Sequence, residues 1–422
     1  MTDDERGRDV GPIHLLALGV NGIVGVGIFF APADIEARAP GAGTAIFALT
    51  ALALAPVALA FAALGRRFDE DGGPVVFARA AFGPLPAFIV GWIAYVSAVS
   101  SSAAVIVGLT TAVGAAAGLG AAAQRIGATM LAALLALLCA AGLRLSARTW
   151  TALTGLKLLP LVALALVFLA VRGAPAPAAP TPAGEGSWPA AALIAVFACQ
   201  GFEIVPVLAG RARRPSFAIP FATVGSLALA AVLYTVLQAA ASWALPDLAA
   251  SRAPLVDAAS VLGGPGLAAF VGAGTSISAL GIAFGMMAAT PFYLAALSRI
   301  DGLGLGLPVV DDRGVPRRAL LVTWALVTLL IQARGRSELF ALSSIAVLIQ
   351  YLVTAAALLA LALRRQRGLG ARHAALAVPA GVLSLCLVAG ASIREATVAA
   401  AALLLGLVLR AARRRLGATA RA

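Results

Sequence analysis

Residues 22–29 read GIVGVGIF, are followed by Pro32, and lie inside a longer apolar run over residues 12–37. A second run, residues 199–203, reads CQGFE and is followed by Pro206 inside an apolar run over residues 189–210. Glycine tolerates backbone conformations that other residues avoid, and proline donates no backbone hydrogen bond. The two runs therefore predict two helices that are each interrupted near the middle.

The composition places these helices in a membrane. Of the 422 residues, 61% are hydrophobic and only 12% are charged, and the mean hydropathy is +0.99. A soluble globular protein has about 25% charged residues, so the composition excludes an ordinary soluble enzyme, a disulfide scaffold or a disordered chain. The three cysteines, Cys139, Cys199 and Cys386, each lie in an apolar run, and their spacing indicates neither a disulfide nor a metal site.

Twelve apolar segments have about the length that a membrane-spanning helix requires. They cover residues 12–37, 42–65, 83–113, 124–143, 149–171, 189–210, 218–244, 264–297, 317–333, 337–363, 374–393 and 396–411. We expect a short tail (1–11), a core (12–363) whose halves are residues 12–171 and 189–363, two further helices (374–411) and a basic tail (412–422). No loop between the segments is long enough for a soluble domain, so the function is expected within the membrane.

The basic residues predict the orientation. If successive loops lie on alternate sides of the membrane, 23 of the 31 basic residues, all arginines, lie on one side, here called the arginine-rich side. One lysine lies within a segment and belongs to neither side. The other, arginine-poor side has seven: Arg38, Arg125, Arg172, Arg252, Arg334, Arg336 and Arg394. Because basic loops stay in the cytoplasm, both termini are expected there, in a cell (inner) membrane. The net charge of +13 then needs no nucleic-acid partner.

The interrupted segments are the first and the sixth, as in a five-plus-five inverted repeat. Corresponding breaks in two halves of a chain are typical of secondary transporters, whose sites lie at such breaks. A glycine-rich packing face is the alternative for residues 22–29. For the second break, Glu203 favours a functional role, because a mid-span charge costs a few kcal/mol or more.

Several motifs occur in order along the chain and together resemble the amino acid–polyamine–organocation (APC) transporter superfamily. They are residues 24–32 (VGVGIFFAP), 65–74, 82–84 with Gly91-Trp92, 197–203 (FACQGFE), 213–220 and 314–319. The chain is most similar to proton-coupled broad-specificity and cationic amino acid transporter-like members. This resemblance implies an all-α polytopic membrane protein with about twelve helices, a leucine-transporter-like inverted repeat and discontinuous helices 1 and 6. Two motifs depart from the pattern: residues 62–65 read AALG where many relatives carry an acidic residue, and the Ser-Arg pair near the end of helix eight is displaced.

The resemblance also implies a substrate site made mainly of backbone. An unwound helix exposes amide donors at the start of one half and carbonyl acceptors at the end of the other, which suits the carboxylate and ammonium of an amino acid. The amides around Gly25, Val26 and Gly27 would bind the carboxylate; the carbonyls of Ile23, Phe197, Ala198 and Gln200 would bind the ammonium, with Gly201 at the break. Phe202 would close over the substrate as a gate, and an ordinary core aromatic is an equal alternative.

Lys157 is the single lysine, and it lies inside the fifth segment, about 12 Å along the helix from the polar start at residues 148–149. A lysine in apolar surroundings can release its proton, whereas an arginine cannot. By resemblance, its ammonium occupies the place of sodium in sodium-coupled relatives, and this favours proton coupling. The alternative is a structural lysine held by backbone carbonyls or by Glu203.

Two other sets of polar residues bear on coupling and specificity. Glu203 is expected to be either a second protonatable group or a structural partner for the break. The serines of the third segment, Ser97 and residues 100–102, could line the pocket or serve as packing contacts. Because that segment has no acidic residue, neutral amino acids are favoured over cationic ones.

The sequence therefore predicts a transporter that carries neutral or broad-range amino acids with protons by alternating access. Its expected partners are an amino acid, protons and the lipid bilayer, with no cofactor. An exchanger or exporter of neutral amino acids is the alternative. A polytopic membrane enzyme is a remote one, because the segments contain no paired His/Asp/Glu cluster.

Overall fold

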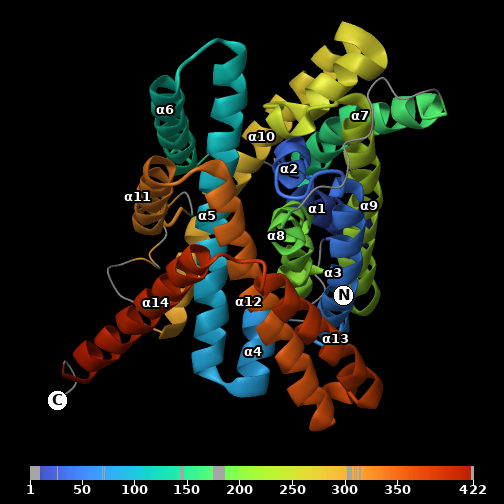
Figure 1. Cartoon of the computed structure of the whole chain (residues 1–422). Coiled ribbons are helices and arrows are strands. Elements are labelled where there is room, and N and C mark those ends of the chain that lie inside the picture. The colour runs from blue at the N-terminus through green and yellow to red at the C-terminus, as the bar shows by residue number, and fades with distance from the viewer. Residues whose placement is uncertain are drawn as a thin grey trace.

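The computed structural model describes residues 10–25, 27–68, 70, 72–142, 147–173, 186–301, 307, 309, 311–312 and 315–419. These residues form a bundle of α-helices and short 3₁₀ helices (η) without a β-strand (Figure 1). The elements are α1 (Pro12–Ile23), α2 (Gly27–Glu36), α3 (Gly43–Gly65), α4 (Pro74–Phe82), α5 (Pro84–Ala116), α6 (Ala121–Ala140), α7 (Ala147–Val171), α8 (Trp188–Cys199), η1 (Phe202–Arg211), α9 (Pro215–Ala244), η2 (Leu248–Ala250), α10 (Pro254–Asp301), α11 (Arg317–Ala333), α12 (Arg336–Leu363), η3 (Gln366–Gly368), α13 (Ala371–Val388) and α14 (Ile393–Thr419).

Eleven of the twelve predicted spans are supported by the structure. Ten helical stretches of the described chain are long and apolar enough to cross a membrane, and the bent pair α1 and α2 forms an eleventh. The remaining predicted segment is α11, whose bounds, Arg317–Ala333, match the prediction and whose 17 residues lie at the short end of the range for membrane helices. The chain is thus an all-α polytopic membrane protein.

Two helical pieces were not predicted. The helix α4 lies in the link between the second and third spans, and α10 begins ten residues before the predicted start of the eighth span. Both pieces are too short to cross a membrane, so a search for long apolar runs does not find them. Glycines with positive φ separate them from the spans that follow: Gly83 (φ +88°) ends α4, and Gly264 (φ +73°) bends α10.

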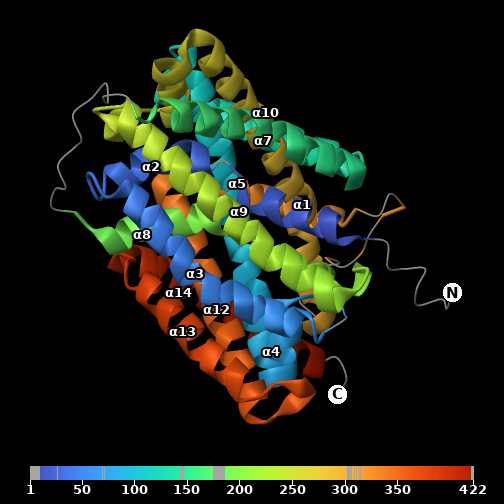
Figure 2. The ribbon, with the colours of Figure 1, turned by 90° about the vertical axis from the view of Figure 1, so that its right-hand side faces the viewer.

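The helix contacts follow a two-fold pattern that relates α1–α7 to α8–α12. If α1/α2 correspond to α8/η1, then the contact between α2 and α8 corresponds to that between η1 and α1, and both occur. The pairs α5–α12 and α10–α7 correspond in the same way, as do α5–α6 and α10–α11. The helices α3 and α9, equivalent in the two halves, pack along each other, as Figure 2 shows. This is the contact pattern of an inverted repeat.

The last two spans pack outside this repeat. The helix α13 contacts α12 and α3, and α14 contacts α5 and α12. The indole Nε1 of Trp92 donates a hydrogen bond to the Ala402 carbonyl at 2.7 Å, and the Arg410 guanidinium lies 5.2 Å from the centre of the Phe88 ring. One turn beyond Ala402, a Cβ placed on Gly406 would lie 2.5 Å from the Trp92 ring. The attachment of α14 therefore depends on the absence of a side chain at residue 406.

We predict that Gly406→Ala destabilises the protein by about 1–3 kcal/mol, because Trp92 must shift to admit the methyl group. Gly127→Ala is the matched control, since a Cβ at Gly127, also within a helix, meets no atom within 4 Å. Thermal unfolding of the purified protein in detergent measures the difference. Equal melting temperatures for the two variants would contradict this account of the α14 contact.

Candidate functional site

The first break separates α1 from α2. Val24 leaves the helical conformation (φ −72°, ψ 82°), and the Gly25 amide folds back onto the Ile23 carbonyl at 2.7 Å. The chain turns by 41° between the two helices. Val26, a predicted binding residue, lies outside the described residues, and Gly27 begins α2. The predicted interruption of the first span is present.

The second break lies between α8 and η1. The helix α8 ends at Cys199, Gln200 is extended (φ −70°, ψ 154°) and Gly201 has φ +129°. From Phe202 the chain continues as a 3₁₀ helix, whose hydrogen bonds link residues three apart rather than four. The sixth span is therefore interrupted at the predicted residues.

The two breaks touch each other through backbone. A Cβ on Gly201 would lie 2.3 Å from the Gly22 carbonyl carbon, and one on Gly27 would lie 2.9 Å from the Ala198 Cα. The end of α1 thus lies against the start of η1, and the start of α2 lies against the end of α8. Only glycine permits both approaches, because any larger residue would collide with main-chain atoms that cannot rotate away.

Lys157 projects from α7 onto the first break. Its side chain is only 3% exposed, and its Nζ donates hydrogen bonds to the Asn21 carbonyl at 3.1 Å and to the Val24 carbonyl. Asn21 lies in the last turn of α1 and Val24 is its C-cap residue. At such a helix end the carbonyls lack internal partners and a cation is favoured. In the described chain, Lys157 is hydrogen bonded to backbone at the break rather than to Glu203.

A tyrosine from α9 completes the contacts of this turn. The Tyr234 hydroxyl donates a hydrogen bond to the Ile23 carbonyl at 2.9 Å, which also accepts the Gly25 amide. Both lone pairs of this carbonyl, a predicted acceptor for a substrate ammonium, are thus bonded to protein donors in this conformation. Phe197 and Ala198, whose carbonyls are the other predicted acceptors in the last turn of α8, are buried.

Serines from two other spans meet the second break. The Gln200 Nε2 donates to Ser101 Oγ at 3.1 Å and to Ser343 Oγ at 2.9 Å. The two serine hydroxyls lie 2.6 Å apart, and Ser97 Oγ lies 3.1 Å from Ser343 Oγ. Of the predicted serines, Ser101 therefore contacts the break directly and Ser97 reaches it through Ser343, whereas Ser102 donates to the Ala98 carbonyl of its own helix.

Ser343, in α12, was not predicted from the sequence. It lies in an apolar segment far from any motif, and only a pairing of α12 with α5 could have indicated it. Tyr234 and Tyr351 were missed for the same reason, since a tyrosine in a hydrophobic segment has no local signal that separates a functional from a packing role.

Aromatic rings cover the second break on both sides. Toward the start of α12, the rings of Phe197 and Phe340 stack with centroids 4.0 Å apart. Toward its end, Phe202 lies 5.3 Å from the Tyr351 ring and 5.8 Å from the Phe61 ring. Phe202, predicted as a gate or a core aromatic, is fully buried in this second cluster. The breaks thus lie between two aromatic layers, both closed in this conformation.

Glu203 binds across the second break. Its Oε2 accepts hydrogen bonds from the Gly201 amide at 2.7 Å and from the Tyr351 hydroxyl at 2.8 Å. The carboxylate therefore bonds an amide that the unwound backbone leaves without a helical partner. It also ties the start of η1 to α12.

The sequence also matches known proteins. The family model for amino acid permeases matches residues 10–403. The chain belongs to this family. This membership confirms the resemblance that the sequence motifs indicated.

Three relatives illustrate the range of similarity within this permease family. An uncharacterized transporter of Mycobacterium tuberculosis is 29% identical over 377 residues, which cover 86% of this chain and 82% of the relative. The branched-chain amino acid permease BcaP of Bacillus subtilis is 28% identical over 259 residues, 57% of this chain and 55% of that protein. The mouse b(0,+)-type amino acid transporter 1 is 31% identical over 101 residues, 24% and 21% of the two chains.

We predict that Gly201→Ala destabilises this permease by more than Gly264→Ala does. Both glycines have positive φ, which costs a side chain about 1–3 kcal/mol. A Cβ at Gly264 meets no atom within 4 Å, whereas one at Gly201 collides with the Gly22 backbone. Thermal unfolding of both variants isolates the cost of the collision, and equal losses would show that the two breaks do not need their close contact.

Proposed function

We propose that this amino acid permease carries neutral or broad-range amino acids together with protons by alternating access. The observation that carries the proposal is the position of Lys157, a buried ammonium hydrogen bonded to the broken first span. The same span is the one whose amides are expected to bind the substrate. A change of charge on Lys157 would therefore act directly on the backbone at the substrate site.

The substrate would bind between the two breaks. Its carboxylate would accept hydrogen bonds from the amides of Gly25, Val26 and Gly27, at the start of α2, where the helix dipole favours a negative charge. Its ammonium would lie against the carbonyls of Phe197 and Ala198, at the end of α8. This arrangement recognises the two groups that all α-amino acids share, and so supports a broad range of side chains.

Two further predicted acceptors, the carbonyls of Ile23 and Gln200, complete this site. The Ile23 carbonyl becomes available when the Tyr234 hydroxyl turns away, so substrate binding would exchange one donor for another. The Glu203 Oε2 is bonded to Gly201 and Tyr351, which leaves it poorly placed to neutralise a cationic side chain. Together with the absence of acidic residues from α5, this supports neutral over cationic substrates. The Bacillus subtilis relative is a branched-chain amino acid permease, which agrees with that preference.

Lys157 would couple the proton to movement of the first span. When charged, the ammonium holds the carbonyls of Asn21 and Val24, which fixes the end of α1 against α7. When the proton leaves, the neutral amine binds the carbonyls less strongly, since charged hydrogen bonds are roughly twice as strong as neutral ones. The end of α1 is then released from α7. The helix α1 begins on the arginine-rich side of the cell membrane, and we assign this side to the cytoplasm by the positive-inside rule.

The two aromatic layers would act as gates. The Phe197–Phe340 stack closes the path toward the arginine-poor side, and Phe202 with Phe61 and Tyr351 closes the path toward the arginine-rich side. Alternating access requires that only one gate opens at a time.

We predict that Lys157→Met abolishes the stimulation of amino-acid uptake by an inward proton gradient. The methionine keeps the length of the side chain and removes its charge. Lys157→Arg keeps the charge and cannot release it, so it should also lose stimulation. Sodium-free uptake of a mixed labelled amino-acid pool into proteoliposomes, with and without the gradient, measures the effect. Leu156→Ala, an exposed neighbour on α7, is the control.

Exchange is the alternative outcome of the same measurement. Wild-type uptake that ignores the gradient but requires amino acid inside the vesicles would make the protein an exchanger with a structural Lys157. Gradient-stimulated uptake that survives in Lys157→Met would assign the coupling proton to another group.

We predict that Glu203 stabilises the second break. Glu203→Ala would leave the Gly201 amide and the Tyr351 hydroxyl unpaired, at about 1–3 kcal/mol for each buried group. Glu203→Gln keeps an acceptor oxygen and should lose less. Adding Tyr351→Phe to Glu203→Ala should cost less than the sum of the single changes, because the two residues share one hydrogen bond. A stable Glu203→Gln protein without proton stimulation would instead make Glu203 a proton carrier.

A further inference from the structure

A cavity lies on the arginine-poor side, away from the helix breaks. Its volume is about 490 Å³, within the roughly 300–1,000 Å³ range of small-molecule sites. Residues from the ends of α2, α5 and α11, the start of α6 and the loop after η2 line it. The cavity is thus formed between the broken first span and the helices that surround it.

Arginine dominates the charge of this cavity. Arg125, Arg252 and Arg334 line it, together with one carboxylate, that of Asp34. The arginine-poor side has only seven of the 31 basic residues, and three of these seven line one cavity. The positive-inside rule explains why this side has few arginines, but it does not explain why they gather here.

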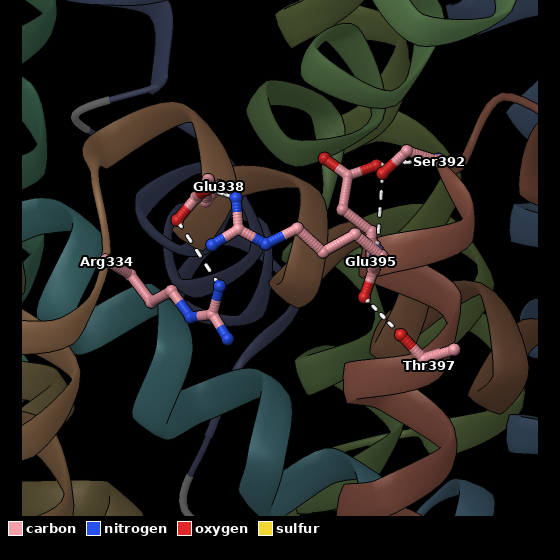
Figure 3. Close-up of polar contacts among 6 residues, drawn as sticks. Arg334, Glu338, Ser392, Glu395 and Thr397 are labelled. Carbon is pink, nitrogen blue, oxygen red and sulfur yellow. Dashed lines mark hydrogen bonds and ion pairs between the residues drawn. The ribbon is translucent and has the colours of Figure 1, made fainter.

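Neighbouring carboxylates offset only part of this positive charge: Asp34 lines the cavity, and Asp257 accepts a hydrogen bond from the lining residue Ser251 at 2.5 Å. Arg334 points toward Glu338, as Figure 3 shows, at 3.7 Å between NH1 and Oε2. The same carboxylate binds Arg394 at 3.0 Å, so two guanidinium groups share one negative charge. Arg125 donates to a neutral acceptor, the Gln332 carbonyl, at 3.4 Å. The cavity therefore keeps a positive excess that suits an anionic ligand.

Along α12, the Phe197–Phe340 stack lies between the level of the cavity and the level of the second break. Along α12, Phe340 comes between the cavity residue Gly335 and Ser343, which contacts the second break. Along α2, Asp34 lies seven residues beyond Gly27, about 10 Å away. A ligand in this cavity would thus wait outside the gate rather than occupy the site between the breaks.

We propose that this cavity captures amino acids by their carboxylates before they reach the helix breaks, and that it selects against cationic amino acids. The inference rests on the proposed function. A site made mainly of backbone between the breaks recognises the groups common to all amino acids. Its lack of a free carboxylate disfavours cationic side chains but attracts no particular charge. A positively charged vestibule supplies that selection, because it concentrates anions and repels cations. An acidic amino acid, with two carboxylates, is its preferred ligand.

Equilibrium binding of radiolabelled glutamate, glutamine and lysine to the permease in neutral lipid nanodiscs tests the proposal. Glutamate and glutamine have nearly the same shape and differ in charge. We expect wild type to prefer glutamate over glutamine by about tenfold at low salt, to bind lysine weakest, and to lose the preference as salt screens the arginines. Arg125→Gln and Arg252→Gln should each reduce the preference several-fold.

Two further variants control this experiment. Arg172→Gln removes the same charge on the same side from a residue that does not line the cavity, and should retain the preference for glutamate. Arg252→Lys keeps the charge and should restore most of it. A wild type without preference, cavity variants that retain it, or a control that loses it equally would each overturn the proposal.

The Lys157→Met variant separates this inference from the proposed coupling. If it loses proton-stimulated transport and keeps the preference for glutamate, both proposals stand. If wild type transports amino acids with protons and shows no preference, only the capture site is wrong. If the preference depends on the arginines and no proton stimulation is found in wild type, only the coupling is wrong.

Discussion

The contact between the backbones of Gly22 and Gly201 determines how the two halves of this permease meet. With a Cβ at Gly201 placed 2.3 Å from the Gly22 carbonyl carbon, neither position has room for a side chain. The first and sixth spans can therefore approach until their main chains touch, and each is interrupted where it crosses the other. In the proposed function, an amino-acid zwitterion would supply partners to the amides and carbonyls that the breaks free.

Because of this constraint, the carbonyls at the first break need hydrogen-bond donors from other parts of the protein. Every carbonyl that the end of α1 leaves open within the bilayer needs a donor. Lys157 supplies one for Asn21 and Val24, and Tyr234 supplies one for Ile23. Since these donors come from α7 and α9, the break is tied to two further spans. Coupling by Lys157 would act through competition for these carbonyls.

Charge is divided between two levels of the molecule. Around the breaks, the described polar contacts are made by amides, carbonyls and hydroxyls, with Lys157 and Glu203 each bonded to backbone. Beyond the Phe197–Phe340 stack, three arginines line a cavity, and their charge can act on a ligand before it makes contact. In the two proposals, backbone and hydroxyl contacts would let the inner site release its substrate, whereas a charged vestibule would raise the local concentration of one class of ligand without holding it tightly. Recognition of the amino-acid backbone and selection by side-chain charge would then be separate steps.

The sequence alone determined the class of protein, the spans and the positions of both breaks. These features follow from local properties of the sequence: the length of each apolar run, the glycines of residues 22–29 and the run around Gly201. In a membrane, such properties are enough to indicate where helices cross and where they are interrupted. The sequence also singled out Lys157, because the chain has one lysine and thirty arginines, and the lysine lies in an apolar segment. No knowledge of the fold is needed to see this. Only the tertiary structure decided which groups meet these residues. The partners of Lys157 lie 133 and 136 positions away, and Ser343 reaches Gln200 across 143. Contacts at such separations depend on how helices pack, and an apolar helix gives no sign of which of its polar residues will face a break and which will face a neighbouring helix.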